Sequence, residues 1–226
     1  MIEQQPTNAL ASAIHASLLY QSGNKDAALS LLEESVNLTH WEDFYLNSAA
    51  TSQSLLEHSG LTKTASKLTS LMGVSFENQI TLNKTLREIH RNLHQHSPQQ
   101  QENLRNLTAQ IGQRFRDRGE NGVLLNSILG QVLQEASLRN LPDDAPSPFH
   151  NLTVVEARER LAQQKEQLNQ VATQNPLFDP HDEGSGLKIP PGLTQDILIN
   201  YIDRIALTGE LNATNWLNQQ LGRSHP

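Results

Sequence analysis

The sequence predicts an all-α protein, on three observations. Leucine makes up about 15% of the 226 residues, whereas aromatic residues make up only 4%, a composition that favours helices. Apolar residues recur at spacings of three and four over most of the chain, and no stretch shows the alternation of a strand. A seven-residue motif also returns after 37 residues, as it does in stacked helical units.

The composition also excludes several classes of protein. The chain has no cysteine, which rules out disulfides, cysteine-bound metals and thiol nucleophiles. Its net charge of −7 argues against binding nucleic acid through bulk electrostatics. No apolar run is long enough for a membrane span, and the first residues do not resemble a secretory signal. We therefore expect a cytoplasmic protein, or one exported without a cleaved signal, that uses no cofactor.

The repeated motif predicts two helical hairpins. Residues 17–23 (SLLYQSG) and 54–60 (SLLEHSG) agree at five of seven positions. Gly23 and Gly60 would each end a first helix, because glycine readily adopts the left-handed conformation of a helix end. Ala28 and Ala65, five residues further on, would let the second helix of each hairpin approach the first. The hairpins should occupy about 7–38 and 44–74 and stack on each other.

This pattern resembles the tetratricopeptide (TPR) repeat. The resemblance rests on Leu19 to Gly23, Ala28 and Leu32, although the period is 37 residues rather than the family's usual 34. A weaker third unit would begin near Phe115 and turn at Gly119. The resemblance implies a concave groove that binds a peptide or helix of a partner protein, as in an adaptor, chaperone-like or regulatory module. The implied groove residues are Ser17, Tyr20, Gln21, Asn47, Ser54, Glu57 and His58.

Further helices are expected after the hairpins. Leu82 to Leu93 and Leu104 to Phe115 each place apolar residues on one helical face, and Ser97-Pro98 is a typical start for the second of these helices. The broad apolar face of 123–138 is typical of a central helix. We expect a helical repeat-like domain over 1–140, followed by a Pro-rich linker or loop over 141–152.

A C-terminal helical region is expected over 153–226. Thr153 and Glu156 form a capping-box pattern that opens a long helix over 153–174. An irregular stretch should fill 175–194, after which Thr194 and Asn212 can each cap a helix. The long helix carries heptad-spaced seams, which are either packed on the same chain or paired between two copies. The seam residues are Val154, Leu161 and Leu168, with Ala157, Gln164 and Val171 beside them.

Other candidate sites are weaker. Residues 77–118 hold seven Lys or Arg and four acids, a basic segment that could take an acidic partner segment. Its candidate patch is Arg87, Arg91, Arg114, Arg116 and Arg118. His90 and His94 have metal-ligand spacing, but Arg91 stands where a zinc-protease motif needs Glu, so we expect no metal there.

Three function classes follow. The preferred one is a protein-interaction module. The alternatives are a self-assembling component that pairs through 153–174, and a hydrolase or metal-dependent enzyme that uses the acidic loop 179–183. No phosphate-binding loop, nucleophile elbow or zinc signature appears in the sequence, and we therefore expect a protein that is not an enzyme.

Overall fold

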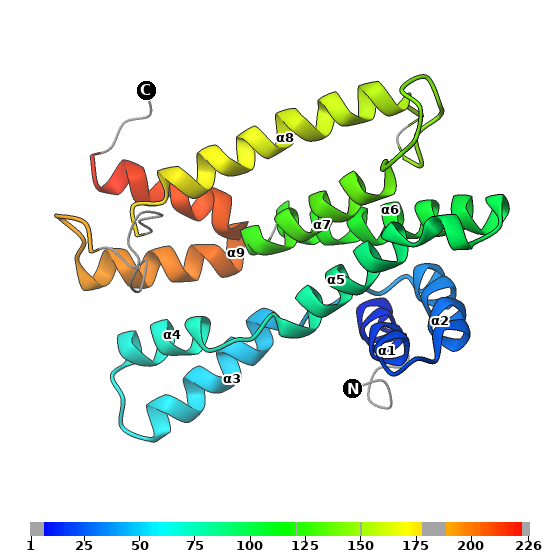
Figure 1. Ribbon diagram of the computed structural model, residues 1–226. Coiled ribbons are helices and arrows are strands. Elements are labelled where there is room, and N and C mark those ends of the chain that lie inside the picture. The colour runs from blue at the N-terminus through cyan, green and yellow to red at the C-terminus, as the bar shows by residue number, and fades with distance from the viewer. Residues whose placement is uncertain (1–6, 121, 150, 178–188, 223–226) are drawn as a thin grey trace. The chain divides into compact units, whose positions relative to one another are not determined.

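The computed structural model describes residues 7–120, 122–149, 151–177 and 189–222. These residues form nine α-helices, one short 3₁₀ helix and no strand, which confirms the all-α prediction (Figure 1). The helices are α1 (Ala9–Gln21), α2 (Lys25–Asn37), α3 (Tyr45–His58), α4 (Lys63–Met72), α5 (Glu77–Arg91), η1 (Leu93–Gln95), α6 (Pro98–Glu120), α7 (Leu124–Ser137), α8 (Val154–Gln174) and α9 (Gln195–Gln220).

The chain divides into two compact units, each assembled from three segments. Unit 1 comprises residues 1–43, 75–116 and 128–163, and unit 2 comprises 44–74, 117–127 and 164–226. The hairpin α1–α2 belongs to unit 1 and the hairpin α3–α4 to unit 2, so each unit contains one of the two expected hairpins. The domain boundaries expected from the sequence, and the stacking of the two hairpins, stay predictions.

The core of unit 1 contains fully buried side chains from α2, α5, α6 and α7. Helix α1 packs against both α2 and α5. Asn8 caps α1, and its side-chain oxygen accepts from the Leu10 amide at 3.1 Å. The Asn8 side-chain amide donates to the Glu42 carbonyl at 2.8 Å, and its oxygen accepts from the Glu42 amide at 3.2 Å. Asn8 therefore fastens the start of the first hairpin to the segment that follows it. The large core side chains that are fully buried include Leu32, Leu82, Leu86, Ile89, Ile111, Phe115 and Leu133.

Both hairpins turn in the same way, as the repeat predicts. Gly23 and Gly60 have φ angles of +91° and +96°. In each turn the glycine amide and the next amide donate back to the last carbonyls of the helix, which is the Schellman type of helix end. The serine before each glycine also donates its hydroxyl to a helix carbonyl, at 2.9 Å in the first hairpin and 2.7 Å in the second.

The second helices of the two hairpins differ in register. Asn24 is the N-cap of α2, one residue after its glycine, whereas Thr62 is the N-cap of α4, two residues after its glycine. In α2, Ala28 is fully buried, as expected. In α4, Ser66 is buried instead, and the prediction for Ala65 is wrong because the longer turn rotates Ala65 outward.

Helices α6 and α7 approach each other unusually closely. In unit 1, a Cβ added to Gly130 would lie 2.4 Å from the Gly112 carbonyl oxygen. In unit 2, a Cβ added to Gly119 would lie 2.2 Å from the Ser127 hydroxyl oxygen. These glycines are required by packing, since no side chain fits between the backbones. Gly119, where the third repeat unit is expected to turn, is the second-last residue of α6, so this helix ends one residue later than expected, and the third unit stays a prediction.

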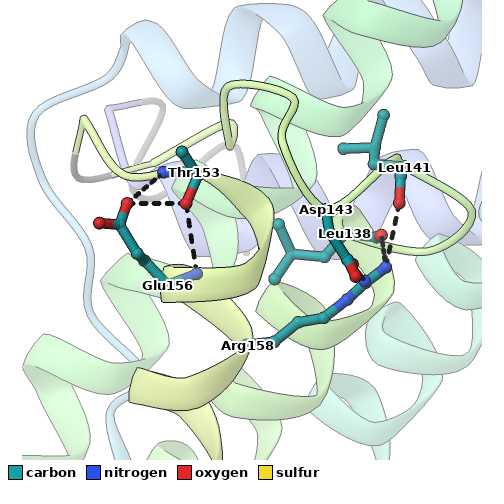
Figure 2. A network of polar contacts seen from close by, with 6 residues as sticks. All are labelled: Leu138, Leu141, Asp143, Thr153, Glu156 and Arg158. Atoms are coloured by element: carbon teal, nitrogen blue, oxygen red, sulfur yellow. Dashed lines mark hydrogen bonds and ion pairs between the residues drawn. The ribbon is translucent and has the colours of Figure 1, made fainter.

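Helix α8 begins at the expected capping box. The Thr153 amide donates to the Glu156 carboxylate at 2.8 Å, and the Glu156 amide donates to the Thr153 hydroxyl at 3.4 Å. One turn later, Arg158 pairs with Asp143 and donates to the Leu138 and Leu141 carbonyls, at 3.2 Å each (Figure 2). The Pro-rich segment between α7 and α8 is thus a loop fixed to the start of α8.

Helix α9 is broken at Gly209, whose φ of 80° and ψ of 161° are not helical. The expected cap at Asn212 is wrong, because Asn212 lies within the helical turns after this break and donates to the Thr208 carbonyl. Glu210 follows the break, and its carboxylate accepts from the Leu124 amide at 2.9 Å. Burial raises the pKa of this carboxyl group, while the hydrogen bond from Leu124 opposes the rise.

Candidate functional site

The groove residues predicted from the first hairpin are mostly inside unit 1. Ser17 is 0% exposed, and its hydroxyl donates to the Ile14 carbonyl at 2.7 Å. Tyr20 is 8% exposed, with the Lys25 ammonium group 5.4 Å from its ring centre. Gln21 is exposed. Ser17 and Tyr20 therefore take part in the packing of unit 1, and a role for these three residues in binding stays a prediction.

The groove residues predicted from the second hairpin are all exposed on α3. They are Asn47, Ser54, Glu57 and His58, and Ala50 lies among them. Their spacing of three to four residues places them along one side of the helix. His58 Nδ1 lies 2.9 Å from the Ser54 carbonyl oxygen, and the Glu57 carboxylate accepts from the Gln53 side-chain amide at 2.7 Å. These local bonds order a polar surface on α3 that remains open to solvent.

A groove that the sequence did not reveal lies in unit 2, between α4 and the start of α9. Its volume is about 450 Å³. Leu68 and Leu198 line it, and both pack on the core cluster of Tyr201, Ile202, Ala213 and Leu217. Ala65 also lines it, because the longer turn before α4 rotates this residue away from α3. The full lining is Thr62, Thr64, Ala65, Leu68, Leu177, Ile189, Leu193, Thr194, Gln195 and Leu198.

The groove is bordered by polar but uncharged groups. Thr62 and Thr194 are the N-caps of α4 and α9, and their hydroxyls accept from the amides of Ala65 and Ile197 at 3.4 and 3.3 Å. Gln195 donates its side-chain amide to the Thr64 hydroxyl, which links the two helices at this border. None of the lining residues that the structure describes is charged. The arrangement suits an apolar, uncharged surface better than an ionic one.

The basic patch expected on residues 77–118 is partly used inside unit 1. Arg114 donates to the Val36 carbonyl at 2.7 Å at the end of α2, and its guanidinium lies 5.7 Å from the Trp41 ring centre. Arg116 donates to the Gln134 side chain at 2.9 Å. Arg91 is exposed and Arg87 is half-buried on α5, while Arg118 is half-buried on α6. That these arginines bind an acidic partner segment stays a prediction.

The histidine pair does not keep its helical spacing. His90 is buried on α5, with Nε2 2.9 Å from the Thr108 hydroxyl oxygen, whereas His94 is exposed on η1 after α5 has ended. No group of three or more metal-ligating side chains occurs in the parts of the chain that the structure describes. The acidic loop 179–183, on which the enzyme alternative depended, lies outside the described residues.

The seam of the long helix is partly buried within its own chain. Val154, Ala157 and Leu161 form a core cluster of unit 1 together with Leu138. Leu168 and Val171, in unit 2, are half-buried. The first heptad therefore packs on the same chain, whereas pairing of α8 between two copies stays a prediction.

Comparison of the sequence with protein-family models and curated proteins, and of the structure with solved structures, found no match. Of the TPR resemblance, the structure supports only the paired helices, α1 with α2 and α3 with α4, which form hairpins. Within the described ranges, no helix combines the length and apolar character that a membrane span requires.

Proposed function

We propose that this protein is an interaction module that binds an amphipathic helix of a partner protein. The observation that carries the proposal is the apolar groove of unit 2, lined by Ala65, Leu68 and Leu198 and bordered by threonines and Gln195. Grooves of this kind accept helices that present apolar side chains at spacings of three, four and seven residues.

The chemistry of the groove specifies the occupant. The chain carries 17 basic and 24 acidic residues, yet the described lining of the groove contains none of them. Burying a partner's charge there would leave it without a counter-ion, at a considerable cost in free energy. The bound face of the partner helix should therefore hold leucine-sized apolar side chains, with its charges on the opposite face.

The test uses peptides selected from a phage-displayed library of random 16-residue sequences. Ala65→Gln places a longer side chain in the groove while leaving the core of unit 2 intact, because Ala65 is already exposed. Ala50→Gln makes the same change on the exposed side of α3 and is the matched variant. Peptides selected on the wild-type protein should carry helically spaced apolar residues and lose about tenfold or more in affinity for Ala65→Gln alone.

The other outcomes assign the site differently. Loss of affinity on Ala50→Gln alone would locate binding at Asn47, Ser54, Glu57 and His58, and the groove proposal would then be wrong. If both variants bound the peptides as tightly as the wild-type protein, neither surface would be the binding site. Enriched peptides without apolar periodicity would show that the bound segment is not an amphipathic helix.

A further inference from the structure

A second pocket, of about 430 Å³, lies within unit 1. One wall is a single face of α6 that includes Glu102, Arg105 and Asn106. The opposite wall is the connection from α7 to α8, represented by Asn140 and Pro146. The volume falls in the range of small-molecule sites, which is roughly 300–1,000 Å³.

The loop wall of this pocket is held in place. The Val154 amide donates to the Ala145 carbonyl at 2.9 Å, and the Ser147 amide donates to the Leu152 carbonyl at 2.8 Å. Arg158 fastens the preceding residues through Asp143, as Figure 2 shows. A ligand would therefore meet a preformed surface, so that little conformational entropy is lost on binding.

Arg105 is half-buried and has no carboxylate partner among the described residues. Its Nη1 donates to the carbonyls of Ser137 and Arg139, at 2.8 and 2.7 Å, at the end of α7. Burial lowers the pKa of this guanidinium, which indicates that water screens its charge incompletely. Within the described chain no acidic group forms an ion pair with Arg105, and its positive charge can accept an anionic group from a ligand.

Glu102 supplies the opposite charge to the same pocket. It lies one turn before Arg105, is exposed, and makes no ion pair within the described residues. Residues three apart on a helix have Cβ atoms roughly 5–6 Å apart. At this spacing, Arg105 can contact a carboxylate while Glu102 contacts an ammonium group attached to the same carbon atom. A simple anion would be repelled by Glu102, and a simple cation by Arg105.

The remaining lining separates into amides and apolar groups. Asn106 and Asn140 offer carboxamides that can both donate and accept hydrogen bonds. Leu141, Ala145 and Pro146 offer an apolar wall. We propose that this pocket binds a free α-amino acid with an apolar side chain, its carboxylate on Arg105 and its ammonium group on Glu102. The site extends the protein's role beyond the proposed binding of a partner helix.

The experiment is isothermal titration calorimetry on the full chain with L-leucine. Two matched probes each lack one charge: 4-methylpentanoate has no amino group, and 3-methylbutylamine has no carboxylate. L-leucine should bind, and each probe should bind about tenfold more weakly or worse, the size of one lost charge-assisted hydrogen bond. Glu102→Gln should remove the preference for L-leucine over 4-methylpentanoate, and Asn106→Ala should weaken both.

Glu159→Gln is the matched control, because Glu159 is an exposed acid of unit 1 outside the pocket. It should leave L-leucine binding unchanged. No heat of binding with L-leucine, L-methionine or L-phenylalanine up to their solubility limits would overturn the proposal. Binding that is equally weakened by Glu159→Gln, or unaffected by Glu102→Gln, would also overturn it.

Discussion

Protonation of His90 should destabilise unit 1. The imidazole is 3% exposed, shares a hydrogen bond with the Thr108 hydroxyl on α6, and has no hydrogen-bond partner at Nδ1 among the described residues. Burial, together with the guanidinium groups of Arg105 and Arg139, lowers its pKa from 6.5 to about 4, while the backbone of Leu104 opposes the shift. A proton on this ring would be a buried charge facing two other cations.

The size of the effect follows from the pKa. A pKa lowered from 6.5 to about 4 corresponds to roughly 3 kcal/mol, at about 1.4 kcal/mol for each unit of pKa. Between these two values the unfolded chain binds a proton that the folded chain does not. The free energy of unfolding therefore falls as the pH is lowered through this window, and His90 should account for about 2 kcal/mol of the loss between pH 7 and pH 4.5.

Urea unfolding of the wild-type protein and of His90→Gln at both pH values isolates this contribution. Glutamine can still bond Thr108 but does not titrate, whereas the carboxylates titrate in both proteins and cancel in the comparison. The wild-type protein should lose about 2 kcal/mol more than the variant over this interval. An equal loss in both proteins, or a His90 ring resonance that titrates near 6.5 in NMR spectra, would refute the reasoning.

Three further predictions concern packing. Gly130→Ala should lower the free energy of unfolding by about 1–3 kcal/mol in a urea titration, because the new Cβ would lie 2.4 Å from the Gly112 carbonyl oxygen. Arg114→Met should lower it by about 1–3 kcal/mol, because the partly buried carbonyl groups of Ser35 and Val36 at the end of α2 lose their donor. Arg158→Gln should speed proteolytic cleavage within 141–152, because the loop loses its attachment to Asp143, and mass spectrometry of the fragments measures this.

Each of these predictions has a result that contradicts it. Alanine is the better helix former, so a Gly130→Ala protein as stable as the wild type would show that α6 and α7 are further apart. Arg91→Met is the control for Arg114→Met, because it removes an exposed arginine from α5. If it lowered the free energy of unfolding as much as Arg114→Met does, the hydrogen bonds from Arg114 to α2 would not explain the loss. Unchanged cleavage in Arg158→Gln would mean that the capping box at Thr153 holds the loop without Arg158.

Features encoded by neighbouring residues could be predicted from the sequence. The Thr153–Glu156 capping box, the start of α6 at Pro98 and the helix ends at Gly23 and Gly60 all depend on hydrogen bonds within one turn of helix. Because such bonds are local, the residue types alone indicate where these elements begin and end.

Features that depend on distant partners could not be predicted in this way. Helix α1 is buried on nearly every side, so no polar stripe in its sequence indicates which side faces solvent, and the burial of Tyr20 could not be predicted from its residue type. Gly119 has the residue type of a turn, yet it is required by contact with Ser127 on another helix.

The outward orientation of Ala65, which lines the groove of unit 2, has one signal in the sequence. The glycines of the two hairpins are 37 residues apart, whereas the caps Asn24 and Thr62 are 38 apart. That one-residue difference moves Ala65 from the contact with α3 to the surface of the groove.

The central claim is that the groove between α4 and α9 binds a partner helix. The most direct measurement is photo-crosslinking in cells from the protein's natural source, with benzoylphenylalanine at position 65 or at position 50, followed by sequencing of the crosslinked segment. Position 65 should react with a segment whose apolar residues have helical spacing, and position 50 should not. Crosslinks from position 50 alone, or to segments without an apolar face, would contradict the claim.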